Sequence, residues 1–142
     1  MLKTGFTGQF EHNLDDKGRV SLPAKFKKYI EQIVSDPENA GQLVLSKGSH
    51  DCIEAYTADD WEKMVEGFNQ NTSLKGGNNP DEIRDKARFT DTVTLDKSGR
   101  IMINANLKAI AGIKKKVVFL GVIDRIEIWA AEKLAEYDNG RR

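Results

Sequence analysis

The chain contains an internal duplication, and this feature restricts its fold more than any other. Residues 14–27, LDDKGRVSLPAKFK, recur as residues 95–108, LDKSGRIMINANLK, at a constant offset of 81 residues. A second block, residues 51–58, recurs at 124–131 with an offset of 73 residues. Stacked repeat folds need at least three units to bury a continuous core, so two copies predict a pseudo-symmetric pair that shares one core.

The composition is that of a globular domain. The 142 residues are 39% hydrophobic and 31% charged, and no apolar run has the length of a membrane span or a signal-peptide core. We therefore expect a cytoplasmic protein with no membrane partner. The single cysteine, Cys52, excludes an internal disulfide. One cysteine and two histidines also disfavour a zinc site, so no metal is expected.

The net charge is zero, but the charges are unevenly distributed. Residues 17–30 and 97–123 hold eleven of the 22 basic residues and none of the 22 acidic ones. Both stretches begin inside the repeated motif. DNA-binding proteins use Lys and Arg to neutralise phosphates, so this distribution indicates a nucleic-acid partner. A solvated charged face is the alternative explanation for either stretch alone.

A β-hairpin is predicted at the start of each copy. In the first copy, alternating apolar residues indicate a strand over 6–14, and a second strand returns over 19–22. Between them, Asp15 to Gly18 forms the expected tight turn. The Asp side chain can accept a hydrogen bond from the backbone two residues on, and Gly tolerates a positive φ.

Helices and a second hairpin follow in each copy. The apolar spacing predicts a helix over 23–34, while Asn104 and Gly112 are the expected N-cap and end of its shorter counterpart. A hairpin over 43–56 recurs at 117–129. In the helix that follows the first of these hairpins, apolar spacing predicts a core-facing side made of Trp61, Met64, Val65 and Phe68.

These elements predict an α+β fold, mainly β, in two halves. The first half covers residues 6–68 and the second covers 81–137, with an Asn- and Gly-rich linker over 69–80 and a frayed tail over 138–142. The difference between the two offsets gives the first copy eight extra residues. SDPENAG, residues 35–41, is the expected place of this insertion.

The first turn has the chemistry to bind DNA. It presents Arg19 to solvent, with Lys17 and Ser21 on the same face. A two-stranded ribbon fits the major groove, and the forked donors of Arg match O6 and N7 of guanine. Lys17 and Lys25 are the expected phosphate contacts. The spacing equally allows Arg19 to pair with Asp15 and stiffen the turn, and the two roles are compatible.

The second turn carries the same motif with one informative difference. Arg100 shares its strand face with Met102, where the first copy has Ser21. Because Met is usually covered by protein, we expect this turn to be mainly structural or interfacial, with DNA contact as the alternative. The motif of the second turn comprises Asp96, Lys97, Gly99 and Arg100.

No group of residues has the pattern of a catalytic site. His50 and Cys52 come nearest to a base and a nucleophile, but they share a strand face that leaves little room for a third, orienting group. A hydrogen-bonded turn histidine and a buried cysteine fit better. The chain also lacks a Gly-rich phosphate loop. We therefore expect no enzymatic activity, no cofactor and no small-molecule substrate.

The segment FTGQFEHNLDDKGRVSLPAKFK resembles the start of the MraZ family of bacterial transcriptional regulators, and LDKSGRIMI resembles that family's second copy. The resemblance covers nearly the whole chain. It implies an AbrB-like swapped-hairpin fold, or double-split β-barrel, in which the two halves interlock as a pseudo-dimer with short helices. It also implies a ring-shaped homo-oligomer.

The resemblance further implies a function. The family binds double-stranded DNA at short direct repeats upstream of its own operon, in the gene cluster for division and cell-wall synthesis, which places it at the nucleoid. The family's DNA-binding motif falls on Asp15, Lys17, Gly18 and Arg19, and its second copy on Asp96, Gly99 and Arg100. The alternative is an antitoxin-like or scaffold module that uses the same fold to bind proteins.

Overall fold

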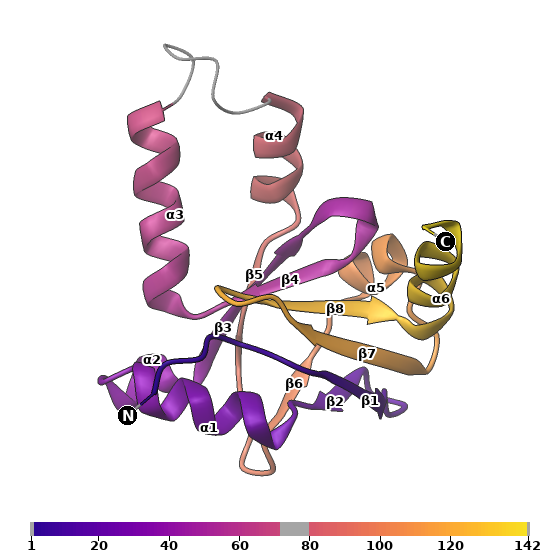
Figure 1. Cartoon of the computed structure of the whole chain (residues 1–142), viewed down its shortest axis with the longest axis horizontal. Helices are drawn as coiled ribbons and strands as arrows, with labels where there is room; N and C mark the ends of the chain where they lie inside the picture. The colour runs from indigo at the N-terminus through magenta and orange to yellow at the C-terminus, as the bar shows by residue number, and fades with distance from the viewer. Residues whose placement is uncertain (1, 72–79, 142) are drawn as a thin grey trace.

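The computed structural model describes residues 2–71 and 80–141, which form a six-stranded antiparallel sheet and a separate two-stranded ribbon (Figure 1). The ribbon consists of β2 (Arg19–Ser21) and β6 (Arg100–Met102). The sheet contains, in spatial order, β1 (Gln9–Asn13), β7 (Lys116–Gly121), β8 (Ile126–Ala130), β4 (Ile53–Tyr56), β3 (Gln42–Lys47) and β5 (Asp91–Thr94).

The two halves of the chain exchange their first strands. β1 comes from the first half but pairs with β7 of the second, while β5 of the second half pairs with β3 of the first. The predicted hairpins β3–β4 and β7–β8 are both present and meet through β4 and β8 at the centre of the sheet. The predicted α+β, mainly β, swapped-hairpin pseudo-dimer is therefore confirmed.

The local hairpin predicted for residues 6–22 is wrong beyond its turn. The turn itself closes through a hydrogen bond from the Asp15 N–H to the Arg19 carbonyl, at 2.8 Å. However, β1 leaves the turn to pair with β7, and β2 leaves it to pair with β6. Alternation of apolar residues predicts that a strand exists but does not select its partner, which depends on contacts far apart in sequence.

The helices that flank the ribbon form as predicted. α1 (Ala24–Ile33) buries Phe26 and Ile30, and the Phe26 ring packs edge-on against Phe6 and Phe10 in the core. α5 (Ala105–Ala111) begins at Asn104, whose side chain accepts a hydrogen bond from the Leu107 N–H at 2.8 Å. Gly112 ends α5 in the left-handed conformation, with φ of 66°.

Two further helices refine the predicted boundaries. α2 (Pro37–Ala40) lies inside the predicted insertion over 35–41. α6 (Ala131–Gly140) continues into the segment predicted as a frayed tail over 138–142, so residues 138–140 are helical. Within residues 2–71 and 80–141, none of the helices combines the length and apolar character needed to cross a bilayer.

α3 (Ala58–Asn71) and α4 (Pro80–Arg88) project away from the sheet, at the end of the molecule opposite α1 (Figure 1). α4 has no counterpart in the sequence prediction. α3 begins as predicted, with the Thr57 hydroxyl accepting a hydrogen bond from the Asp60 N–H at 3.2 Å. Residues 69–71 of the predicted linker belong to α3, Pro80 begins α4, and residues 72–79 lie outside the described residues.

The predicted core-facing side of α3 is not in the core. Trp61, Met64 and Phe68 are only half-buried, and Val65 is 39% exposed. Trp61 still packs against Tyr56, with ring centroids 5.7 Å apart. Because α3 leaves the sheet after its first turn, the rest of its apolar side extends beyond the body of the chain. Helical spacing shows that a helix has an apolar side, not that the same chain covers it.

Candidate nucleic-acid interface

The first turn is held by the carboxylate of Asp15. This carboxylate accepts hydrogen bonds from the backbone N–H groups of Lys17 and Arg19, at 2.9 and 2.8 Å, and from the Arg19 Nε at 2.9 Å. Gly18 has a φ of 84°, which an L-residue with a side chain rarely adopts. The predicted pairing of Arg19 with Asp15 is therefore present, and it fixes the direction of the Arg19 guanidinium.

The second turn repeats this arrangement atom for atom. Asp96 accepts hydrogen bonds from the N–H groups of Ser98 and Arg100, at 2.8 and 3.0 Å, and from the Arg100 Nε at 3.0 Å. Gly99 has a φ of 77°. The duplicated sequence thus builds the same turn twice, each with one arginine held by one aspartate.

Both aspartates are stabilised in their charged form. The hydrogen bond from the Arg19 backbone lowers the pKa of Asp15 below its ordinary value, and the Arg19 side chain adds to this effect. The Arg100 backbone lowers the pKa of Asp96 in the same way. At neutral pH each arginine therefore lies beside a full negative charge, which keeps the turn closed.

The ribbon joins the two turns, which lie at its opposite ends because β2 and β6 are antiparallel. In its register Arg19 lies opposite Met102, and Ser21 lies opposite Arg100. The ladder continues at both ends, where the Leu22 N–H donates to the Gly99 carbonyl at 3.0 Å and the Ile103 N–H donates to the Gly18 carbonyl at 2.9 Å. One surface therefore carries both arginines.

The expectation that protein covers the face carrying Met102 does not hold within the chain. The Met102 side chain is 51% exposed. The side chains of Arg19 and Arg100 have nearly the same exposure, 30% and 32%, and the Arg100 Nη1 lies 3.7 Å from the Asp15 carboxylate. An exposed Met102 is compatible with the interfacial role expected for the second turn, and the ribbon sets each arginine beside the other copy's residue.

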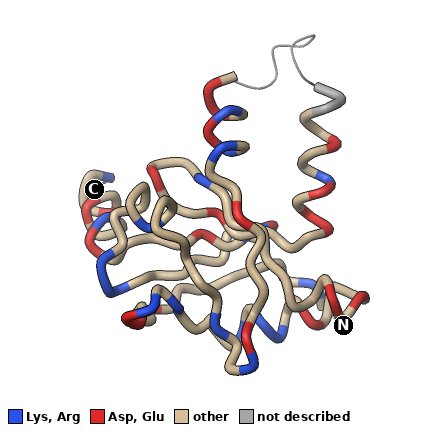
Figure 2. The backbone as a smooth tube through the Cα atoms, turned by 180° about the vertical axis from the view of Figure 1, so that it is seen from behind, with Lys and Arg blue, Asp and Glu red and all other residues tan. Residues whose placement is uncertain are grey.

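Exposed lysines surround this surface. Lys17 and Lys97 are exposed in their turns, and Lys25 on α1 is also exposed, with its Nζ donating to the Thr7 hydroxyl at 3.1 Å. α1 also carries Lys27, which lies beside Gly99 and was not singled out by the sequence. Figure 2 shows the basic segments gathered along the lower edge of the molecule, interrupted by acidic residues at the turns. The surface can therefore attract a polyanion.

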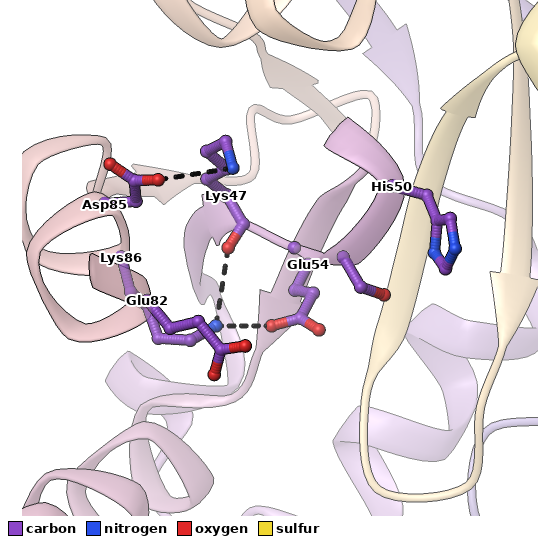
Figure 3. Close-up of a pocket in the computed structure, with 8 residues that line it drawn as sticks. Lys47, His50, Glu54, Glu82, Asp85 and Lys86 are labelled. Carbon is purple, nitrogen blue, oxygen red and sulfur yellow. Dashed lines mark hydrogen bonds and ion pairs between the residues drawn. The ribbon is translucent and has the colours of Figure 1, made fainter. Parts of the chain in front are cut away.

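A second polar region lies at the opposite end, between the β3–β4 hairpin and α4 (Figure 3). It is a pocket of about 420 Å³ in which four of the charged side chains, Lys47, Glu54, Asp85 and Lys86, form ion pairs. The Lys86 Nζ lies 2.6 Å from Oε1 of the buried Glu54, and the Lys47 Nζ lies 3.5 Å from the Asp85 Oδ2. These pairs attach α4 to the sheet, so we assign the pocket a structural role.

Glu54 and Glu127 form a pair of facing carboxylates at the centre of the sheet. The two residues lie opposite each other in the β4–β8 register, and each carboxylate accepts a hydrogen bond from the aromatic residue two positions on, Tyr56 at 2.7 Å or Trp129 at 2.9 Å. Burial by itself raises the pKa of Glu54, but the hydrogen bonds from Lys86 and Tyr56 outweigh it and leave the pKa below its ordinary value. The repeated Ile-Glu-x-aromatic sequence is thus explained by packing.

The residues considered for catalysis do not form a site. Cys52 is 1% exposed, and burial raises the pKa of its thiol far above the ordinary value. His50 is exposed and packs edge-on against Tyr137, with ring centroids 4.7 Å apart. Among the described residues, no cluster of three or more His, Cys, Asp or Glu side chains is placed to hold a metal ion.

Fold and surface together define a class, that of swapped-hairpin proteins with a duplicated arginine-bearing turn. Residues 6–78 and 87–139 match the model of the MraZ protein family, described as antitoxin-like. The chain is 36% identical over 139 residues to "Transcriptional regulator MraZ" of Thermoanaerobacter sp. (strain X514), covering 93% of this chain and 85% of the relative. It is 35% identical over 133 residues to the protein of the same name from Lactobacillus helveticus (strain DPC 4571), covering 94% and 86%. The chain belongs to the MraZ family.

Proposed function

We propose that the chain is a sequence-specific, DNA-binding transcriptional regulator without enzymatic activity, and that it acts in the cytoplasm at the nucleoid. Its two interlocked halves, residues 6–68 and 81–137, present one reading surface. The observation that carries this proposal is the ribbon, which places Arg19 and Arg100 together on an exposed, lysine-rich face. The names of the relatives, "Transcriptional regulator MraZ", support the same function.

The chemistry of the turns suits base recognition. Asp15 holds the Nε side of Arg19, and within residues 2–71 and 80–141 the guanidinium has no other ion-pair or hydrogen-bond partner. Its outer nitrogens are therefore directed by the turn and available to guanine O6 and N7 in the major groove. Asp96 holds the Nε side of Arg100, whose Nη1 also lies 3.7 Å from the Asp15 carboxylate.

The surrounding groups suit contacts to the DNA backbone. Lys17 and Lys97 are exposed within the turns that carry the arginines, Lys25 is exposed at the start of α1, and Ser21 supplies a half-exposed hydroxyl. Contacts of this kind position a protein on the duplex but carry no sequence information. In this proposal the arginines supply specificity, and the lysines supply affinity that decreases with salt.

Assembly would explain how a chain of zero net charge binds DNA. The apolar side of α3, which includes the exposed Val65, is incompletely covered, and α3 projects from the end of the molecule opposite α1. We include in the proposal a homo-oligomer, in the form of a ring, that uses this side of α3. Several ribbons could then bind successive short direct repeats at once, and effective concentration would supply the affinity. Val65→Asp is expected to reduce the assembly mass measured by light scattering while leaving the circular dichroism spectrum unchanged.

A salt titration tests the proposed function. Binding of the intact protein to the DNA upstream of its own gene, the proposed promoter target, is measured by fluorescence anisotropy against a scrambled duplex of equal length. We expect a steep decrease of affinity with salt and a preference for the upstream DNA of at least about tenfold. Equal, weak binding to both duplexes would contradict the proposal.

A second candidate function is that of a protein-binding module, which the antitoxin-like description of the family favours. Such a module could use the ribbon or the apolar side of α3 to bind a protein partner. In that case the same titration would show no preference for the upstream DNA, and affinity for the protein partner would depend weakly on salt.

A further inference from the structure

Three consecutive lysines, residues 114–116, lie directly beside the first turn. The carbonyl of Lys115 accepts a hydrogen bond from the Leu14 N–H at 2.7 Å, and Lys116 lies opposite Asn13 in the β1–β7 register. Asp15, which begins the turn, is the next residue along. Residues 115 and 15 are distant in sequence, so only the exchange of β1 between the halves brings these lysines to the turn.

All three lysine side chains are exposed. Within residues 2–71 and 80–141, none of their ammonium groups makes an ion pair or a hydrogen bond. Asp16 adds one acidic residue to this turn, but it is exposed and the three lysines outnumber it. In Figure 2 the first turn lies at the lower left of the view, with a basic segment next to it.

The equivalent place beside the second turn carries no charge. There the Leu95 N–H donates to the Gly41 carbonyl at 2.9 Å, and Thr94 lies opposite Gln42. These contacts correspond to those of Lys115 and Lys116, but the residues are Gly41 and Gln42. The segment before them is α2, which contains Glu38. The two turns therefore share their internal geometry and differ in the charge of the strand that flanks them.

We propose that Lys114, Lys115 and Lys116 form a phosphate-binding site for duplex DNA, which makes the first turn the stronger of the two DNA contacts. The proposal rests on the proposed function. Each lysine is a flexible point charge suited to a phosphate, and neutralising phosphates releases counterions from the duplex. Because the charge lies on one side of a pseudo-twofold ribbon, each chain acquires a preferred direction along the duplex.

The test compares two charge-matched variants of the full-length protein. Lys114→Gln/Lys115→Gln removes two charges beside the first turn, and the control, Lys3→Gln/Lys63→Gln, removes two exposed charges elsewhere. Light scattering checks that both variants assemble like the parent. Binding to the upstream and scrambled duplexes is then measured at several salt concentrations.

We expect the first variant to reduce the slope of log Kobs against log salt by about 1.8, since each phosphate contact contributes about 0.9. Affinity should decrease by the same factor for both duplexes, because phosphate contacts carry no sequence information. The control and the conservative Lys114→Arg/Lys115→Arg variant should keep the parental slope. A parental slope in the Gln variant, while the parent binds DNA, would overturn this inference alone. Failure of the parent to bind would overturn the proposed function as well.

A second measurement tests the ranking of the turns. In the parent, Arg19→Ala is expected to weaken binding to the upstream duplex more than Arg100→Ala does. In the Lys114→Gln/Lys115→Gln background the difference between the two substitutions should be smaller, because only Lys116 still favours the first turn. A difference between the arginines that is unchanged in this background would overturn the assigned ranking.

Discussion

The first turn, residues 15–19, and the second turn, residues 96–100, have the same set of hydrogen bonds and nearly the same exposure of their arginines. What separates them is the neighbouring segment of the sheet. Beside the first turn, Lys114 and Lys115 precede β7, which begins at Lys116, whereas β3 begins at Gln42 beside the second turn. A duplicated motif can therefore keep its geometry in both copies while the surrounding sheet gives the copies different partners. Four experiments test this difference between the turns, in decreasing order of the effect we expect.

We expect the β2–β6 ribbon to hold both turns in the same geometry. Val20 and Ile101 lie opposite each other at its centre, and each is 1% exposed. Ile101→Ala leaves a cavity under both turns and should lower the free energy of unfolding by about 2–5 kcal/mol, measured by urea denaturation. Ile101→Val, which makes the pair symmetric, should cost only about 0.5–1.5 kcal/mol. A small loss for the Ala variant would show that the turns do not depend on a shared ribbon.

Removing the arginines should separate the turns in function. Arg19→Ala is expected to weaken specific DNA binding by about 1–3 kcal/mol and to relax base preference. Arg100→Ala should produce a smaller loss of the same kind. Both are measured by anisotropy with the upstream and scrambled duplexes, and light scattering confirms intact assembly. If Arg100→Ala has the larger effect, the second turn is the principal contact.

The aspartates should give the turns a shared dependence on pH. The pKa values of Asp15 and Asp96 are lowered in the folded chain from an ordinary value of 3.8. Their contribution to stability is therefore present above pH 3.8 and is lost as the pH falls through the lower folded values. Urea unfolding at about pH 7 and about pH 3 should show a smaller decrease for Asp15→Asn than for the parent.

Asp96→Asn is the matched control for this pH experiment. Asp96 holds only its own arginine, whereas Asp15 also lies 3.7 Å from the Arg100 guanidinium. We therefore expect Asp96→Asn to flatten the pH dependence less than Asp15→Asn. Equal flattening would show that the contact between the two turns does not contribute to stability.

The smallest expected effect is a gain of charge beside the second turn. Gln42→Lys places a lysine at the position equivalent to Lys116. The slope of log Kobs against log salt should steepen by about 0.9, with equal gains for upstream and scrambled DNA. Lys116→Gln should change the slope by a similar amount in the opposite direction. An unchanged slope in Gln42→Lys would indicate that DNA does not reach the second turn.

Much of the fold can be predicted from local sequence. The Asp-x-x-Gly-Arg spacing predicts both turns because one Asp carboxylate reaches two backbone N–H groups, and only Gly adopts the required φ readily. Asn104 and Gly112 predict the ends of α5 through hydrogen bonds within a few residues. The pairing of Arg19 with Asp15 lies within the same short range.

The features that depend on distant contacts could not be predicted from local sequence patterns, and the exchange of strands was implied only by the resemblance to the MraZ family. The partner of β2, the exposure of Met102 and the projecting side of α3 all follow from how the halves are arranged. A periodic pattern predicts that a residue belongs to an apolar side, but it does not identify what covers that side. For the same reason the sequence does not predict that Lys114–Lys116 lie beside the first turn, and it shows these lysines only as part of a basic stretch.

The amino-acid sequence alone determines that the chain has two equivalent halves, each with an Asp-anchored turn that presents one arginine. It does so because turns, caps and helix starts depend on groups that lie within a few residues of one another. Only the folded arrangement makes the two turns share one ribbon and sets three lysines beside the first turn alone. Strand exchange joins residues that are distant along the chain. Backbone hydrogen bonds between strands form equally well with a strand from either copy, so they do not select the partner.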